Sequence, residues 1–73
     1  MTSLLTRSLA AVETYVTVRI QKNPWKDKTL EAKKIEVESL IQRIKDAGTF
    51  ADIIPEDYEI NIDENNMVSI DPV

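Results

Sequence analysis

The stretch YEINIDENNMVSID, residues 58–71, decides the fold of this chain. Apolar residues alternate with polar ones on both sides of a centre rich in acids and asparagine, which is typical of two short strands joined by a turn. A two-residue loop would pair Ile62 with Ser69 and mix apolar and polar side chains on each face. A three-residue loop at 64–66 pairs Ile62 with Val68 instead, so that the apolar side chains share one face. The sequence therefore predicts an antiparallel β-hairpin over about residues 58–71 in the second register.

The loop and the edges of this hairpin carry further information. Asn66 holds the loop position that needs a left-handed backbone, which Asn adopts more readily than most residues. Two strands alone are barely stable in water and leave both edges unpaired. Lysine, which commonly protects strand edges, is absent from residues 46–73, and Pro72 limits pairing only at the end. We therefore predict that the hairpin packs on other elements and that its edge can accept a strand from a neighbouring subunit.

Upstream, the segment from about residue 27 to residue 47 predicts an α-helix. Its apolar residues recur on one side and most of its charged residues lie on the other. Gly48, the only glycine, follows directly, where a left-handed C-terminal cap is expected. The dipeptide Asn23-Pro24 can open this helix, with asparagine as cap and proline at the first position. A later start, at Asp27 or Thr29, is the alternative.

An earlier helix is predicted over about residues 3–21, with Thr2 or Ser3 as its N-cap. Its apolar stripe advances in steps of four, three, four and four, through Leu5, Leu9, Val12, Val16 and Ile20. The half from Val12 to Ile20 is also rich in β-branched residues, and its alternation would suit a strand. We favour the helix because one helical period accounts for the whole stripe, whereas a strand explains only its second half.

These elements predict an α+β fold in one small domain, residues 1–73: a two-helix antiparallel hairpin followed by a C-terminal two-stranded β-hairpin. A chain of this length buries only about 60% of its unfolded surface on folding. No disulfide or Cys/His zinc site can reinforce it, because the chain has neither residue type. Oligomerisation or a partner is the remaining way to add buried area. The sequence leaves open whether the helices pair within one chain or across a symmetric dimer.

Composition excludes most catalytic chemistry. Without His or Cys there is no catalytic triad, imidazole base, thiolate nucleophile or soft-metal site. The turn 63–66 has acids in series but lacks the glycine and the distal glutamate of a calcium loop. We therefore expect a protein that is not an enzyme, with no catalytic residues, no metal, no cofactor and no small-molecule substrate.

Charge and hydropathy bound the partners and the compartment. The net charge is −4, from 9 basic and 13 acidic residues, which argues against a surface for nucleic acid. Apolar runs are only a few residues long, so no membrane span is expected. The opening residues 1–5 resemble a signal peptide, but Arg7 and Glu13 interrupt the apolar region that one needs. We expect a cytoplasmic protein whose partner is another protein or a second copy of itself.

Two groups of residues are candidates for partner binding. Trp25 lies between the helices, where it either closes the core or anchors an interface, since tryptophan is enriched at binding hot spots. The outer hairpin face, with Glu59, Asp63 and Asp71, forms an acidic row. This row is either the solvated side of the sheet or a surface that meets a basic protein. Like charges on adjacent strands cost some stability, which gives weight to the second interpretation.

The C-terminal half of the chain also resembles a known module. The segments are Leu40–Gly48, Phe50, Asp52–Ile53, Tyr58–Ile62 and Met67–Pro72. They are similar in pattern to the C-terminal module of contractile-tail sheath proteins of bacteriophages: a helix ending near Ala-Gly, a short apolar and acidic link, a strand, a turn rich in Asp and Asn, and a second strand ending near proline. The resemblance implies a small protein of the virion or tail, present in a bacterial host. Such a protein would dock by sharing strands with its neighbours. It places that docking at Ile60, Ile62, Val68 and Ile70.

Two functions therefore come from the sequence. The first is a non-enzymatic structural or assembly protein that docks by helix packing and strand sharing. The alternative is a small acidic inhibitor that binds the basic, nucleic-acid-binding surface of a target protein.

Overall fold

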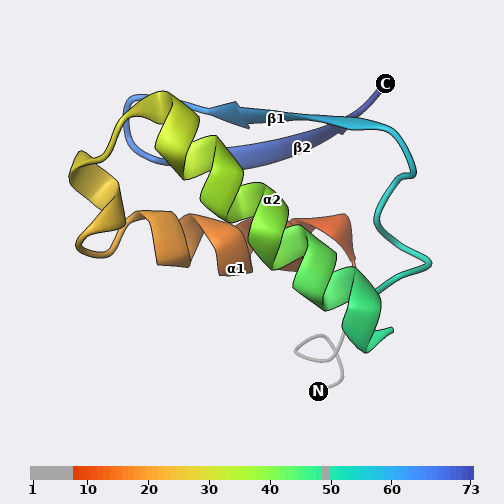
Figure 1. Cartoon of the computed structure of the whole chain (residues 1–73). Helices are drawn as coiled ribbons and strands as arrows, with labels where there is room; N and C mark the ends of the chain where they lie inside the picture. Colours follow the sequence, from red (N-terminus) through yellow and green to blue (C-terminus); the bar gives the residue numbers. More distant parts are fainter. Residues whose placement is uncertain (1–7, 49) are drawn as a thin grey trace, which may run out of the picture.

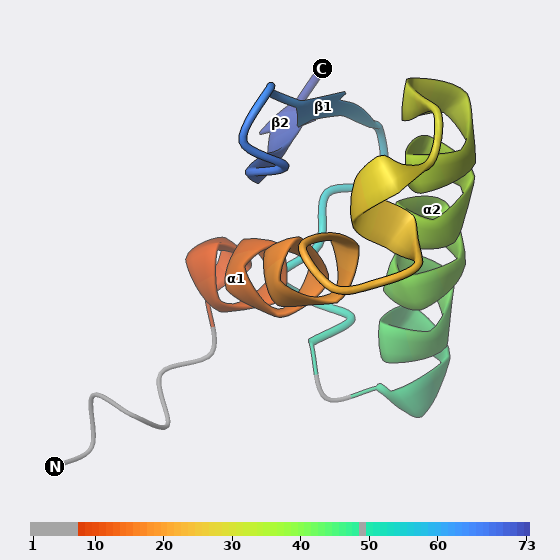
Figure 2. The same ribbon diagram turned by 90° about the vertical axis from the view of Figure 1, so that its left-hand side faces the viewer.

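The computed structural model describes residues 8–48 and 50–73, in which one helix lies under a two-stranded sheet and a second helix lies beside the sheet (Figures 1 and 2). The elements are α1 (Leu9–Ile20), the 3-10 turn η2 (Trp25–Asp27), α2 (Leu30–Ala47), β1 (Tyr58–Ile62) and β2 (Val68–Pro72). The helices run in opposite senses and cross obliquely (Figure 1). Both helices contact the hairpin, β1 lying against α2 and β2 against α1. The predicted α+β fold is confirmed.

Helix α1 begins at Leu9, with Ser8 as its N-cap. The Ser8 backbone is extended, and its Oγ accepts the N–H of Ala11 at 3.3 Å, which satisfies one of the free donors of the first turn. The predicted caps, Thr2 and Ser3, lie outside the described residues. The segment from Val12 to Ile20 is helical, so the strand alternative is wrong: Val12, Val16 and Ile20 point into the core at helical spacing.

Helix α2 takes the latest of the starts that the sequence allowed. Its N-cap is Thr29, whose Oγ1 accepts the N–H of Ala32 at 3.1 Å. Residues 25–27 form a separate 3-10 turn, so the helix does not begin at Asn23-Pro24 or at Asp27. At the other end Gly48 has φ 86°, the left-handed C-cap that its position predicted.

The hairpin has the predicted register. Ile62 pairs with Val68 and Ile60 with Ile70, and Asn66 has φ 64°. The carboxylate of Asp63 stabilises the turn, because its Oδ1 accepts the N–H groups two and four residues later, at 2.8 and 2.9 Å. Lys33 Nζ donates to Asn66 Oδ1 at 2.6 Å and joins the turn to α2.

The core lies between the sheet and the two helices. Only ten apolar side chains of the described residues are buried in it, which is little for independent stability. The segment between α2 and β1 contributes Ile54. The buried set is Val12, Val16, Ile20, Val37, Leu40, Ile41, Ile54, Ile60, Val68 and Ile70.

Candidate functional site

No cluster of metal-ligating side chains is present among the described residues. Residues 8–48 and 50–73 contain no group of three or more acids that could hold a metal ion, and His and Cys are absent from the chain. Within the same ranges no helix is long and apolar enough to cross a membrane. The features of the described residues that suit a binding function lie on the surface, among exposed apolar and charged side chains.

Both charged side chains of α1 are occupied by contacts within the chain. Glu13 Oε2 accepts the N–H of Ile70 on β2 at 2.7 Å. Arg19 Nε donates to Glu36 Oε2 on α2 at 3.1 Å. These are the only two charges among the twelve residues of the helix. The rest of its surface is consequently left without a charge of its own, which is unusual for a helix that faces water.

On the side of α1 that faces away from the strands, an apolar row of one half-buried and two exposed side chains reaches the surface. We call this row the outer stripe; it consists of Ala11, Tyr15 and Val18. With 3.6 residues per turn these three share a face, and Glu13 and Thr17, which contact β2, lie on another. Tyr15 is 57% exposed and Val18 45% exposed. A row of this kind, uninterrupted by charge, is typical of a surface that contacts another protein.

The outer stripe continues into a hollow between the two helices. This apolar hollow has a volume of about 300 Å³ and is lined by Ala11, Val12, Tyr15, Ile44 and Phe50. A second, smaller hollow of about 110 Å³ follows the stripe in the other direction, between Tyr15, Val18, Arg19 and Lys22. Tyr15 belongs to both. Together they form a shallow track along the helix that could receive side chains from a partner.

The free edge of β2 is closed by α1. In the register observed, the N–H groups of residues 68, 70 and 72 point away from β1. Val68 N–H donates to Thr17 Oγ1 at 2.9 Å, Ile70 N–H donates to Glu13, and Pro72 has no N–H. All three positions therefore lack a free donor, and an added strand could not form a complete ladder there. A hollow of about 210 Å³ lies beside this edge, lined in part by Thr14 and Met67.

The outer face of the sheet carries the predicted acidic row, with one change. Glu59 and Asp71 lie directly opposite each other and are exposed. Asp71 Oδ2 is held by two donors, Asn61 Nδ2 and Ser69 Oγ, each at 2.9 Å. Asp63 does not join them, because its carboxylate is used in the turn. The structure thus brings together two of the three predicted acids.

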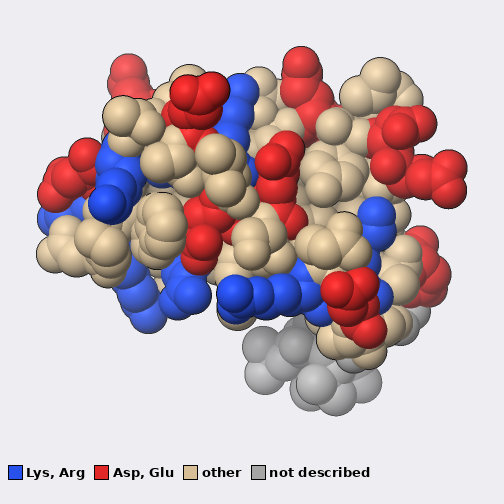
Figure 3. All heavy atoms as spheres, in the orientation of Figure 1, with Lys and Arg blue, Asp and Glu red and all other residues tan. Residues whose placement is uncertain are grey.

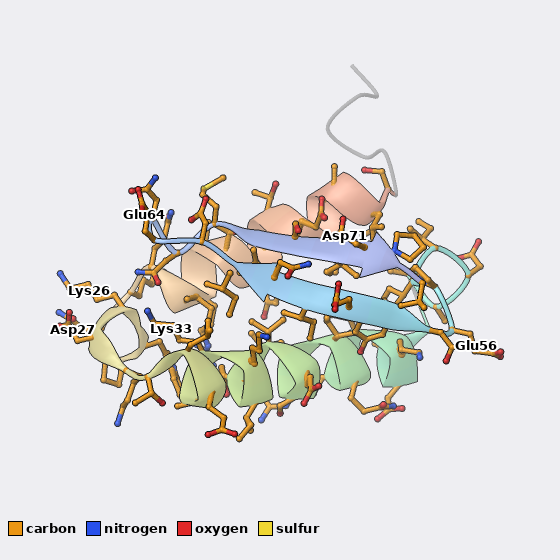
Figure 4. All side chains as sticks on the ribbon, turned by 90° about the horizontal axis from the view of Figure 1, so that it is seen from above. Lys26, Asp27, Lys33, Glu56, Glu64 and Asp71 are labelled. Carbon is orange, nitrogen blue, oxygen red and sulfur yellow. The ribbon has the colours of Figure 1, made fainter. Side chains whose placement is uncertain are left out.

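The charges are separated over the molecule. Of the 13 acidic residues, eight lie in residues 46–73, which contain no basic residue. In the face shown in Figure 3, acidic side chains occupy much of the upper and right-hand margins and basic ones much of the lower margin, while the two kinds are mixed at the left. Seen from above, Glu56 lies at the end of the hairpin opposite to Lys26 and Lys33 (Figure 4). The sheet side of the molecule is therefore acidic, whereas α1 is nearly neutral.

The other predicted binding residues lie mostly inside the molecule. The side chains of Ile60, Val68 and Ile70 are core residues, and Ile62 is half-buried against them. Trp25 is also half-buried and packs against the core. These five residues do not share a surface with Glu59 and Asp71.

The sequence-based prediction missed the outer stripe. Its signal was present in the composition of residues 9–20, where two charges among twelve residues cannot cover a full polar face. The use of Glu13 and Thr17 to close an edge of the sheet could not be read from the pattern, because it depends on the packing of β2 against α1.

A comparison with protein-family models, with curated proteins and with solved structures found no match to this chain.

Proposed function

We propose that this chain is a non-enzymatic assembly protein that binds another protein through the outer stripe of α1. The observation that carries the proposal is that both charges of α1 are used inside the chain while Tyr15 and Val18 remain exposed. Burial of apolar surface is the dominant favourable term in protein association. The core of ten side chains also makes additional buried area valuable to this chain.

The hairpin contributes less to this proposal than the sequence predicted. The edge of β2 has no free donor at its outward positions, so strand sharing would have to use β1. Helix α2 lies alongside β1 (Figure 4) and restricts that approach. The resemblance to tail sheath proteins, which suggested strand sharing, would place the assembly in a phage virion or tail.

The test is to follow the chain in cells of its natural source by gradient sedimentation. We expect the wild-type chain to sediment with a larger particle and the Val18→Glu variant to remain in the slow fraction, because a carboxylate would be buried at the contact. The matched control is Ile35→Glu: Ile35 is 63% exposed and lies on the solvent side of α2. A wild-type chain that sediments free would overturn the assembly role, and co-sedimentation of Val18→Glu would overturn the use of the outer stripe.

A second function, the acidic inhibitor, is favoured by one observation. Glu59 and Asp71 face each other across the strands although like charges in that arrangement are destabilising. Two exposed carboxylates placed opposite each other would be stabilised by a positively charged partner. If the pair is retained for binding, Glu59→Gln should raise the urea midpoint of the free chain at low salt, and the gain should vanish at high salt. A lower midpoint at low salt would mean that the two carboxylates do not destabilise the free chain. The argument for an acidic inhibitor would then be lost.

A further inference from the structure

We infer that the partner on the outer stripe is a second copy of this chain, with the two α1 helices packed antiparallel across a two-fold axis. This inference rests on the proposed function and names the occupant of its surface. It is carried by the spacing of the outer stripe, by the position of the apolar hollow and by the distribution of charge.

The spacing of the outer stripe suits a helix–helix contact. Ala11, Tyr15, Val18 and then Lys22, just beyond the helix, advance in steps of four, three and four. This is the spacing at which one helix packs along another. Residues 9–20 span about 18 Å, enough for three turns of contact.

A two-fold axis midway between residues 15 and 18 gives a self-complementary pairing. Tyr15 of each copy then meets Val18 of the other, and Lys22 of each copy meets Ala11 of the other. The antiparallel arrangement places the positive end of each helix dipole near the negative end of its neighbour. An interface in which each residue meets its counterpart in this reciprocal way is what two-fold symmetry requires.

The apolar hollow fits the same arrangement. It opens beside Ala11, whose small side chain leaves the space of about 300 Å³ accessible between Ile44 and Phe50. The residue that the second copy brings there is Lys22. A lysine can lay its methylene stem along apolar surface and keep its ammonium group in water. The hollow is thus covered without burying a charge.

The distribution of charge makes the outer stripe a better contact for a second copy than the acidic surface of residues 46–73. Each chain carries −4, and the excess of acid lies in residues 46–73 rather than on α1. Glu13 faces β2 and is bonded there. Two copies that meet through the outer stripe therefore bring no carboxylate of α1 into opposition. The remaining repulsion between acidic chains is long-range and is screened by salt, so the dimer should tighten as salt is added.

The proposed contact is short. One face of three helical turns with the adjoining hollow is smaller than a standard interface of about 800 Å² per partner. We therefore expect a dimer that dissociates on dilution through the micromolar range. Its mass must be measured over a wide range of concentration.

The experiment uses the full chain and light scattering across protein concentration and salt. The wild-type chain and Ile35→Glu should move from monomer to dimer as concentration rises, and Val18→Glu and Tyr15→Lys should each stay monomeric. Circular dichroism of the two monomeric variants should match that of the wild type, since both positions are exposed. A wild-type chain that is monomeric at all concentrations would overturn the dimer.

Mixing the two monomeric variants tests the antiparallel pairing itself. In that geometry Glu at position 18 of one copy meets Lys at position 15 of the other, while the second contact keeps its native Tyr15 and Val18. We expect a one-to-one dimer by native mass spectrometry, weakened by high salt unlike the wild type. Absence of a mixed dimer overturns this geometry. A monomeric purified chain that still sediments with a larger particle in cells would overturn the dimer but not the assembly role.

Discussion

The carboxylate of Glu13 on α1 accepts the backbone N–H of Ile70 on β2, at a distance of 2.7 Å and across 57 residues of sequence. One turn further along the helix, Thr17 accepts the N–H of Val68. These two side chains take the place that a neighbouring strand would occupy. Helix α1 therefore fixes the hairpin through polar contacts as well as apolar ones. The contact with β2 also engages one of the two charged side chains of α1. The side of the helix that faces away from β2 is left apolar.

Thr17→Val should destabilise the fold by about 1–3 kcal/mol. The two side chains have nearly the same shape, but valine cannot accept the N–H of Val68, which is left buried without a partner. The measurement is urea unfolding followed by circular dichroism. Thr17→Ser is the control, because it keeps the hydroxyl and loses only a buried methyl group, about 1 kcal/mol. If serine costs as much as valine or more, the hydrogen bond is not the reason for the loss.

Glu13→Ala should expose the amide of Ile70 to hydrogen exchange. The lost contact is a hydrogen bond to a charged group in a half-buried position, for which a loss of about 1.5–3 kcal/mol is typical. Exchange measured by NMR should speed up at Ile70 more than at Ser69, whose N–H points toward β1 in this register. Glu13→Gln keeps an acceptor oxygen and should show a smaller effect. Equal acceleration at both amides would indicate general loosening of the hairpin instead.

The hairpin and the end of α2 could be predicted from the sequence because local rules fix them. Only one of the two registers places the apolar residues of both strands on one face, and Asn66 and Gly48 stand at the two positions of residues 8–48 and 50–73 that have a left-handed backbone. Both signals involve residues that are close together in the sequence. They can therefore be recognised without knowing how the elements pack.

The start of α2 and the full extent of the outer stripe depend on tertiary contacts that the sequence pattern does not contain. Three possible starts of α2 all had suitable residues, and the packing of η2 as a separate turn selected Thr29. The sequence shows that residues 9–20 carry few charges, but not that Glu13 and Arg19 are bonded to β2 and α2, which leaves the outer stripe uncharged. A charged residue in a sequence gives no sign of whether its partner is water or another segment.

Gly48→Ala should cost about 1–2 kcal/mol in the free energy of unfolding. A Cβ at this position would meet nothing within 4 Å, so the cost comes from the left-handed backbone at φ 86° and not from a clash. Gly48→Asn should cost less, because asparagine tolerates this conformation better. Thermal unfolding of the three proteins checks the order glycine, asparagine, alanine. An alanine variant as stable as the wild type would show that the end of α2 can be rebuilt without the left-handed residue.

Alkaline pH should weaken the fold through Tyr58. Burial raises the pKa of its phenol above the ordinary value of 10.0, and the nearby Glu38 carboxylate raises the pKa further. A raised pKa in the folded state means that the neutral phenol is favoured by folding. The resulting stability is fully present below pH 10.0 and is lost as the pH rises through the higher pKa of the folded chain.

Tyr58→Phe should therefore lose less stability than the wild type when the pH is raised above this range, as measured by urea midpoints at a series of pH values. In a Tyr15→Phe background, where Tyr58 is the only phenol, ultraviolet titration reports its pKa directly. Glu38→Gln should lower that pKa only in part, because burial is the larger cause. A Tyr58 pKa at or below 10.0 would contradict the half-buried position of this side chain against the core.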